Sequence, residues 1–204
     1  AFTGAGASLS RSFKNSFYTG TFEYKFEAAT LTATSSYVEE QSSTRSIVTV
    51  PATLNALDGL LGRLPPNTST SLNVLGGFGA EKSTQEIRLT SDASETWEWI
   101  VGLYYADETT FDTQSLIVQP DDGNFQTSSG PSFYKEYAAF GNLTYYVTPD
   151  FDLTVGARLS RSEMVLRAES TTDSALLASF GLNSLSVSRP VKATVDTWSF
   201  AARY

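Results

Sequence analysis

Hydrophobic and polar residues alternate most regularly between residues 137 and 161. On either side of Pro149 and Asp150, one set of alternate positions is clearly more apolar than the other. A period of two is typical of a β-strand with one apolar face, whereas an amphipathic helix repeats every three or four residues. Proline and aspartate both favour a tight turn. The pattern therefore predicts a hairpin of two long strands that meet at Pro149.

Similar alternation recurs along the rest of the chain and predicts an all-β protein of about seven strands. The strand that begins near Thr96 continues to about Val118, and is much longer than the ~5–6 residues that are usual in globular sheets. We expect the remaining strands at residues 16–27, 30–47, 82–91, 137–148, 151–169 and 191–204.

Short and long connections alternate between these expected strands. Residues 27–29, 92–95 and 148–150 predict short turns, whereas 49–81 and 119–132 predict long loops after an irregular lead-in over residues 1–15. Leucines at three- and four-residue spacing between positions 54 and 64 predict a short helix in the first loop, and residues 174–180 predict a second. Short turns on one side and long loops on the other are typical of outer-membrane barrels. The predicted fold is an antiparallel up-and-down transmembrane β-barrel, present as a partial barrel.

Aromatic residues on the apolar faces support the membrane interpretation. Eight residues of strand span roughly 27 Å, or about 20 Å of height at ~40° tilt, which is close to the apolar band between the two aromatic girdles of such barrels. The alternative is that these aromatics stack in the core of a soluble β-sandwich. The pairs spaced by eight residues are Tyr18 and Phe26, Trp97 and Tyr105, and Tyr137 and Tyr145.

Composition narrows the possible functions. The net charge of −8 argues against a nucleic-acid partner, because such binding needs clustered Lys and Arg. The chain has no Cys and no His, which removes disulfides, thiolate metal sites and the commonest metal ligand and general base. We therefore predict no catalytic, metal-binding or cofactor-binding residue, no cofactor, and no enzymatic activity. The sequence has no run of about 18 apolar residues, so it predicts no transmembrane helix.

Three segments carry a family resemblance. Residues 138–161, AAFGNLTYYVTPDFDLTVGARLSR, resemble the strand-turn-strand motif of TonB-dependent outer-membrane receptors. Upstream, QEIRL at residues 85–89 is similar to the family's Q-E-[LI]-R-L strand, and WEWIVGLYY at 97–105 is similar to the W-x-x-G-x-[FY]-Y strand that follows it. The three motifs occur in family order. The resemblance implies a receptor of the Gram-negative outer membrane.

Such a receptor has about 22 strands around a plug domain. The resemblance implies import of a scarce ligand of the siderophore-iron, cobalamin or carbohydrate class with energy derived from TonB. Residues 1–204 are then expected to be a segment of the barrel without the plug. The implied partners are outer-membrane lipid, the plug and remaining barrel strands of the parent chain, the TonB complex acting through the plug, and a small-molecule ligand.

Charged residues on the polar faces are candidates for contacts in the lumen. These are Glu86, Arg88, Glu98 and Arg158, for which charge pairing with a plug or with neighbouring strands is the competing interpretation. The alternation that leads to Tyr204 also resembles an outer-membrane C-terminal signal, which leaves a small complete outer-membrane barrel as one alternative. A soluble β-sandwich used for adhesion or binding is the other.

Overall fold

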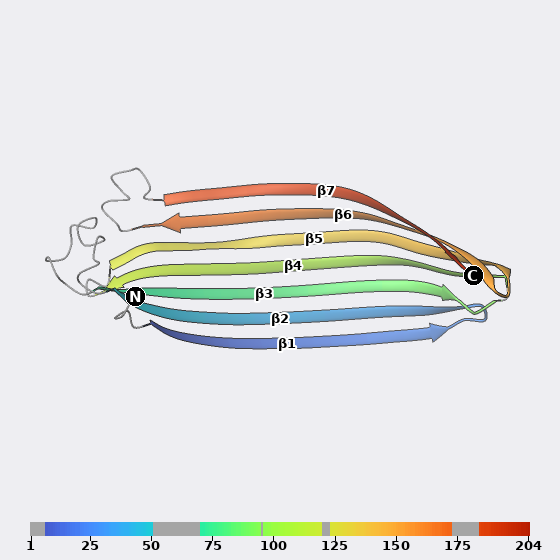
Figure 1. Ribbon diagram of the computed structural model, residues 1–204, viewed down its shortest axis with the longest axis horizontal. Helices are drawn as coiled ribbons and strands as arrows, with labels where there is room; N and C mark the ends of the chain where they lie inside the picture. Colours follow the sequence, from blue (N-terminus) through green and yellow to red (C-terminus); the bar gives the residue numbers. More distant parts are fainter. Residues whose placement is uncertain (1–6, 51–69, 95, 120–122, 173–183) are drawn as a thin grey trace.

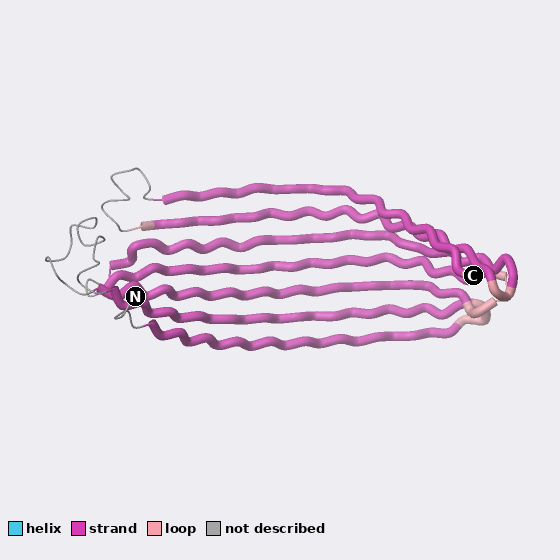
Figure 2. Tube along the Cα trace, in the orientation of Figure 1, coloured by secondary structure: helices cyan, strands magenta, loops and turns pink. Residues whose placement is uncertain are grey.

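The computed structural model describes residues 7–50, 70–94, 96–119, 123–172 and 184–204, which form one antiparallel sheet (Figures 1 and 2). Its seven strands lie side by side in chain order. This confirms the predicted all-β, up-and-down architecture. The strands are β1 (Ala7–Lys25), β2 (Ala29–Val50), β3 (Thr70–Ser91), β4 (Trp97–Gln119), β5 (Gly123–Thr148), β6 (Phe151–Thr171) and β7 (Ser184–Arg203).

Three short turns lie at the same end of the sheet, on the right in Figure 1. In the turn between β1 and β2, the Phe26 N–H donates to the Ala29 carbonyl at 2.8 Å. The turn between β3 and β4 is joined to the first turn, because the Asp92 N–H donates to the Ala28 carbonyl at 3.0 Å. Residues 149 and 150 form the third turn, between β5 and β6. All three turns lie where the sequence predicts them.

Several strands are longer than the sequence pattern indicates. The predicted irregular lead-in is wrong for residues 7–15, and the predicted long loops are wrong for residues 70–81 and 123–132, since all three segments are strand. Residues 123–132 are rich in Ser, Thr and Gly on both faces, so no apolar face identifies them. In residues 7–15 and 70–81 most apolar side chains, such as Phe13 and Phe78, lie on the opposite face of the strand from the apolar residues nearer the turns, so the apolar pattern does not continue through these segments. Backbone hydrogen bonding to neighbouring strands nevertheless extends through them.

The two predicted helices, between residues 54 and 64 and over 174–180, lie outside the described residues. The described part of the chain contains no helix long and apolar enough to cross a membrane.

The pairing of β5 is interrupted at Gly130 and Pro131, in addition to register shifts near its two ends. Pro131 pairs with Phe111 of β4, but pairing with β6 skips both Gly130 and Pro131. Proline has no N–H to donate, so it is tolerated in a strand where the ladder is interrupted. A Cβ atom on Gly130 would overlap the backbone carbonyl of Arg167. Glycine at position 130 therefore permits a close approach of the two backbones beside the proline.

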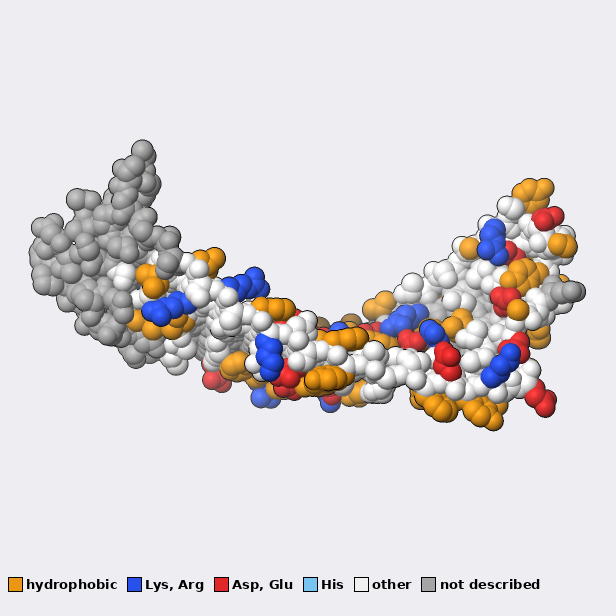
Figure 3. Space-filling view, turned by 90° about the horizontal axis from the view of Figure 1, so that it is seen from below, with side chains coloured by type: hydrophobic (Ala, Val, Ile, Leu, Met, Phe, Trp, Pro, Cys, Tyr) orange, Lys and Arg blue, Asp and Glu red, His pale blue; other side chains and the backbone are white. Residues whose placement is uncertain are grey.

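The sheet is bent along its length (Figure 3), and its two faces differ in burial. The face that carries Ala106 and Ala138, here called the inner face, buries these side chains to 1% and 7% exposure. The opposite, outer face leaves Leu103 and Tyr137 64% and 52% exposed. Within the described residues the only buried apolar side chains are alanines. The sheet thus lacks the close-packed apolar core of a globular domain, and its apolar surface faces outward.

Candidate functional site

An apolar band crosses the outer face of six strands. It consists of the outward residues within 18–24, 31–37, 85–89, 97–105, 137–145 and 153–159, and none of them is charged. On β7 the band continues with Trp198 and Phe200. Asp196 is the acidic residue at this level of β7, and its carboxylate accepts a hydrogen bond from the Trp198 indole N–H at 3.1 Å. Exposed apolar surface of this extent marks a face that contacts a partner or a membrane.

Aromatic residues border this outer band on both sides. Trp97 pairs with Tyr145 near the turns, and Tyr105 pairs with Tyr137 at the opposite border. The rings of Tyr105 and Tyr137 lie 5.0 Å apart with an angle of 43° between their planes. The eight-residue spacing in the sequence therefore corresponds to two cross-strand aromatic pairs, one at each border. Amphipathic rings at the borders of an apolar band are typical of membrane interfaces.

A row of alternating charges crosses the outer face directly beyond Tyr105 and Tyr137. Its members Asp107, Lys135, Glu163 and Lys192 are paired in register across β4, β5, β6 and β7. Lys135 lies 3.2 Å from Asp107, and Lys192 lies 3.0 Å from Glu163. The boundary between uncharged and charged outer positions is thus sharp on β4 and β5, whereas Arg161 of β6 and Asp196 of β7 lie one and two outward positions nearer the short turns than the row.

Glu163 receives a second cation, because Arg161 also contacts its Oε1 atom at 3.0 Å. The side chains of Lys192 and Arg161 each donate a hydrogen bond to this oxygen at 3.0 Å. Both cationic side chains are more than 60% exposed. One carboxylate is therefore shared by two cations that remain accessible from outside the sheet.

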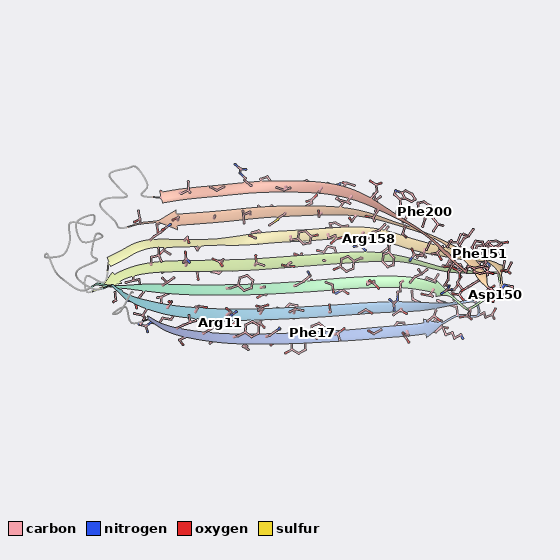
Figure 4. All side chains as sticks on the ribbon, viewed as in Figure 1. Arg11, Phe17, Asp150, Phe151, Arg158 and Phe200 are labelled. Carbon is pink, nitrogen blue, oxygen red and sulfur yellow. The ribbon has the colours of Figure 1, made fainter. Side chains whose placement is uncertain are left out.

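The inner face carries a polar network across its central strands. The Arg158 guanidinium is 2.8 Å from Glu136, and the Tyr134 hydroxyl donates to the same carboxylate at 3.0 Å. Arg158, labelled on β6 in Figure 4, also lies over the ring of Tyr104. Its guanidinium carbon is 5.4 Å from the ring centroid. The side chain reaches across Ala138, which is small enough to lie beneath it. This arrangement holds charged groups against the inner surface of the sheet.

A second ion pair lies beside this network. Lys82 contacts Glu108 at 2.9 Å, and Glu108 is paired in register with Tyr134. Nearer the turns, Arg203 contacts Asp152 at 2.8 Å. Asp152 is buried, and its charge is compensated by this guanidinium. The described residues contain no group of three or more His, Cys, Asp or Glu side chains placed to hold a metal ion.

The structure places all four predicted lumen residues on the inner face. Glu86 and Arg88 are neighbours on β3, 3.5 Å apart, while Glu98 interacts by a side-chain hydrogen bond with Tyr146. Arg158 belongs to the central network, where it contacts Glu136 and Tyr104 and none of the other three predicted residues. The predicted residues are therefore not brought together into one cluster.

The partners of Arg158 were not among the residues singled out from the sequence. Glu136 and Tyr134 share its face by the period of two, which is a usable signal. The pattern does not give the register between strands, so it could not bring these residues level with Arg158.

No protein-family model and no curated protein matches the chain. Among solved structures, the sheet is similar to the ferric yersiniabactin uptake receptor FyuA from Yersinia pestis, with a TM-score of 0.67 and 15% sequence identity. The matched region covers 95% of this chain and 26% of the receptor chain. The fold is similar to part of that receptor's β-barrel.

This chain spans about a quarter of the receptor that it matches. At this identity the likeness establishes the fold and leaves ligand and energy source open. It agrees with the family resemblance of residues 82–161 as far as a barrel-like sheet is concerned.

Proposed function

We propose that this chain is part of the wall of a TonB-dependent receptor in the outer membrane of a Gram-negative bacterium. The uncharged outer band, bordered by aromatic pairs and then by charged residues, is the observation that carries the proposal. Its polarity is the inverse of that of a soluble protein, because its largest apolar side chains are exposed. Lipid is the surrounding that makes such a surface favourable.

The same proposal explains the two open edges of the sheet. Among the described strands, β1 is paired only with β2, and β7 only with β6. Seven alternating strands leave β1 and β7 running in the same direction, so their direct pairing would be parallel. An antiparallel barrel therefore needs at least one further strand, which favours a larger barrel over a small complete one. A sandwich needs a second sheet, and the described strands form one.

The inner face of β1 favours a protein partner inside the barrel. Leu9, Phe13 and Phe17 point to this face and are 74%, 55% and 64% exposed. A lumen lined by water does not favour such a stripe, whereas a plug packed against it would bury the three side chains. The central strands, with Arg158 and its partners, then provide polar contacts to the plug or to a ligand in transit.

In this role the chain contributes a passage and not a catalyst. The transported ligand is proposed to belong to the siderophore-iron, cobalamin or carbohydrate class, and the energy for release is proposed to reach the barrel through a plug contacted by TonB. Ferric yersiniabactin is the cargo named for the similar receptor, and it supports the siderophore class first.

Deletion of the gene in its host tests this function. Uptake of radiolabelled ligands from the three classes is measured in the wild type, in the deletion strain, in the deletion strain with a plasmid copy, and in a strain without TonB. We expect uptake of one ligand class to be lost in the deletion strain and in the strain without TonB. The plasmid copy should restore that uptake in the deletion strain. Unchanged uptake of all three classes, or recovery of the protein in the soluble periplasmic fraction, would contradict the proposal.

A further inference from the structure

We infer that the outer face holds a specific lipid, with an acyl chain in a groove beside Ala139 and a phosphate-bearing head group on Arg161. The inference rests on the proposed membrane location and adds a site to it. The groove exists because Ala139 is small and lies in register between Leu103 of β4 and Leu159 of β6. These two leucines are 64% and 56% exposed and form the walls of a hollow of about 650 Å³.

The end of the groove that lies farther from the short turns is polar. Tyr105, Tyr137, Arg161 and Thr194 are paired in register there, and all four line the hollow. The walls are apolar and the end is polar, which matches an amphiphile that lies along the strands. An acyl chain of a few methylenes beside Ala139 removes apolar surface from the surrounding phase and fills a gap that the side chains leave.

Charge at this end favours a phosphate. Arg161 and Lys192 share the single carboxylate of Glu163, and Lys135 is already paired with Asp107. An additional anion can therefore accept hydrogen bonds from Arg161. Its planar guanidinium can donate two parallel hydrogen bonds to phosphate oxygens. Asp196 is level with Leu159, nearer the short turns, and the hydrogen bond from the neutral Trp198 indole leaves its negative charge in place. The phosphate is thus expected on the side of Arg161 that faces away from Asp196, where the two cations Arg161 and Lys192 outnumber the single carboxylate of Glu163.

The occupant is a lipid and not a free anion, because the groove and the guanidinium adjoin each other. Inorganic phosphate would reach Arg161 but leave the groove empty. A second copy of this chain could cover the apolar walls, but it would bring the same charge row against itself. A phosphate lipid satisfies both the apolar walls and the cation.

The test uses the intact protein that carries this sequence, purified in a neutral detergent, and native mass spectrometry with dioleoyl phosphatidylglycerol. We expect one lipid to be retained per protein. Arg161→Gln should lower retention about fivefold, the usual contribution of one cation near an anionic head group. Ala139→Leu should lower it as well, because the new side chain fills the groove without changing charge.

Two variants serve as controls. Arg45→Gln removes a cation from the same face of β2 and should leave retention unchanged, and Asp196→Asn should leave it unchanged or raise it. Equal retention in the wild type, Arg161→Gln and Ala139→Leu would overturn the inference, as would equal retention of dioleoylglycerol, which has no phosphate. Displacement by inorganic phosphate alone, or a doubled protein mass without lipid, would also overturn it. A protein that never enters detergent micelles or membranes would instead refute the proposed function.

Discussion

Val101 and Gly141 occupy paired positions on β4 and β5, and the valine side chain lies over the glycine. A Cβ atom on Gly141 would be 3.3 Å from the Cγ1 of Val101 and 3.1 Å from the carbonyl oxygen of Ile100. Val101 is 49% exposed, midway between the aromatic borders formed at Trp97 and Tyr105. Its position is the centre of the outer band, the most sensitive place at which to test whether the band faces lipid.

Val101→Arg is therefore expected to impair assembly of the intact barrel far more than Ile100→Arg. Arginine at a lipid-facing midplane position costs roughly 2–4 kcal/mol, whereas on the inner face it can be hydrated or can pair with a carboxylate. The measurement is folding of the intact protein into lipid vesicles, read by protease protection and by urea titration. Equal losses would leave the assignment of faces unsupported, and the reverse order would mean that the outer face had been read as the inner one.

Gly130→Ala is expected to destabilise the sheet by about 1–3 kcal/mol, the usual cost of forcing an added methyl into a filled site. The new Cβ would meet the Arg167 carbonyl, which is backbone and cannot rotate away. Gly20→Ala on β1 is the matched control, because no atom lies within 4 Å of its added Cβ. Urea titration of the two variants in the same vesicles gives the comparison. A loss at Gly20 as large as that at Gly130 would show that glycine content, and not this close approach, sets the cost.

Arg158 and Glu136 should be energetically coupled. Their side chains are 40% and 20% exposed and 2.8 Å apart, so we expect a coupling of roughly 1 kcal/mol in a double-mutant cycle of Arg158→Met and Glu136→Gln. Arg161 and Glu163 provide a more exposed reference pair, for which the coupling should be smaller. Both cycles are measured by urea titration of the folded barrel. A coupling near zero for the inner pair would show that the network around Arg158 does not stabilise the barrel.

The sequence allowed prediction of the strands wherever one face is more apolar than the other. Residues 137–161 show this contrast, and both the hairpin and the assignment of faces are confirmed there. The contrast disappears in residues 123–132, where Ser, Thr and Gly occupy both faces, and it changes sides in residues 70–81, where Val74 and Phe78 lie on the inner face. In residues 123–132 only the continuing ladder of backbone hydrogen bonds makes the segment strand, and such a ladder leaves no periodic signal in the side chains.

The charge row shows a second limit of sequence pattern. Lys135, Glu163 and Lys192 are assigned to the outer face by parity alone, yet their contact depends on the register of three strands. Register is fixed by turn length and by the residues beyond each turn, and no single stretch contains that information. The same reason explains why Glu98 was placed on the correct face while its partner Tyr146 on β5 was not predicted. The role of Glu86, Arg88, Glu98 and Arg158 as ligand contacts stays a prediction.

The two ends of the sheet are expected to face different compartments. Ser94 lies at the end with the short turns, and Ser184 lies at the far end, where it is paired with Thr171. Both serines are exposed and the chain has no cysteine, so Ser94→Cys and Ser184→Cys each introduce one accessible thiol with little change in size. In the proposed orientation the short turns are periplasmic. A maleimide that cannot cross the outer membrane should therefore label Ser184→Cys in intact cells, and should label Ser94→Cys only after the outer membrane has been permeabilised. Equal labelling of both positions in intact cells would exclude a sheet that spans the membrane, whereas labelling of Ser94→Cys alone would invert its orientation.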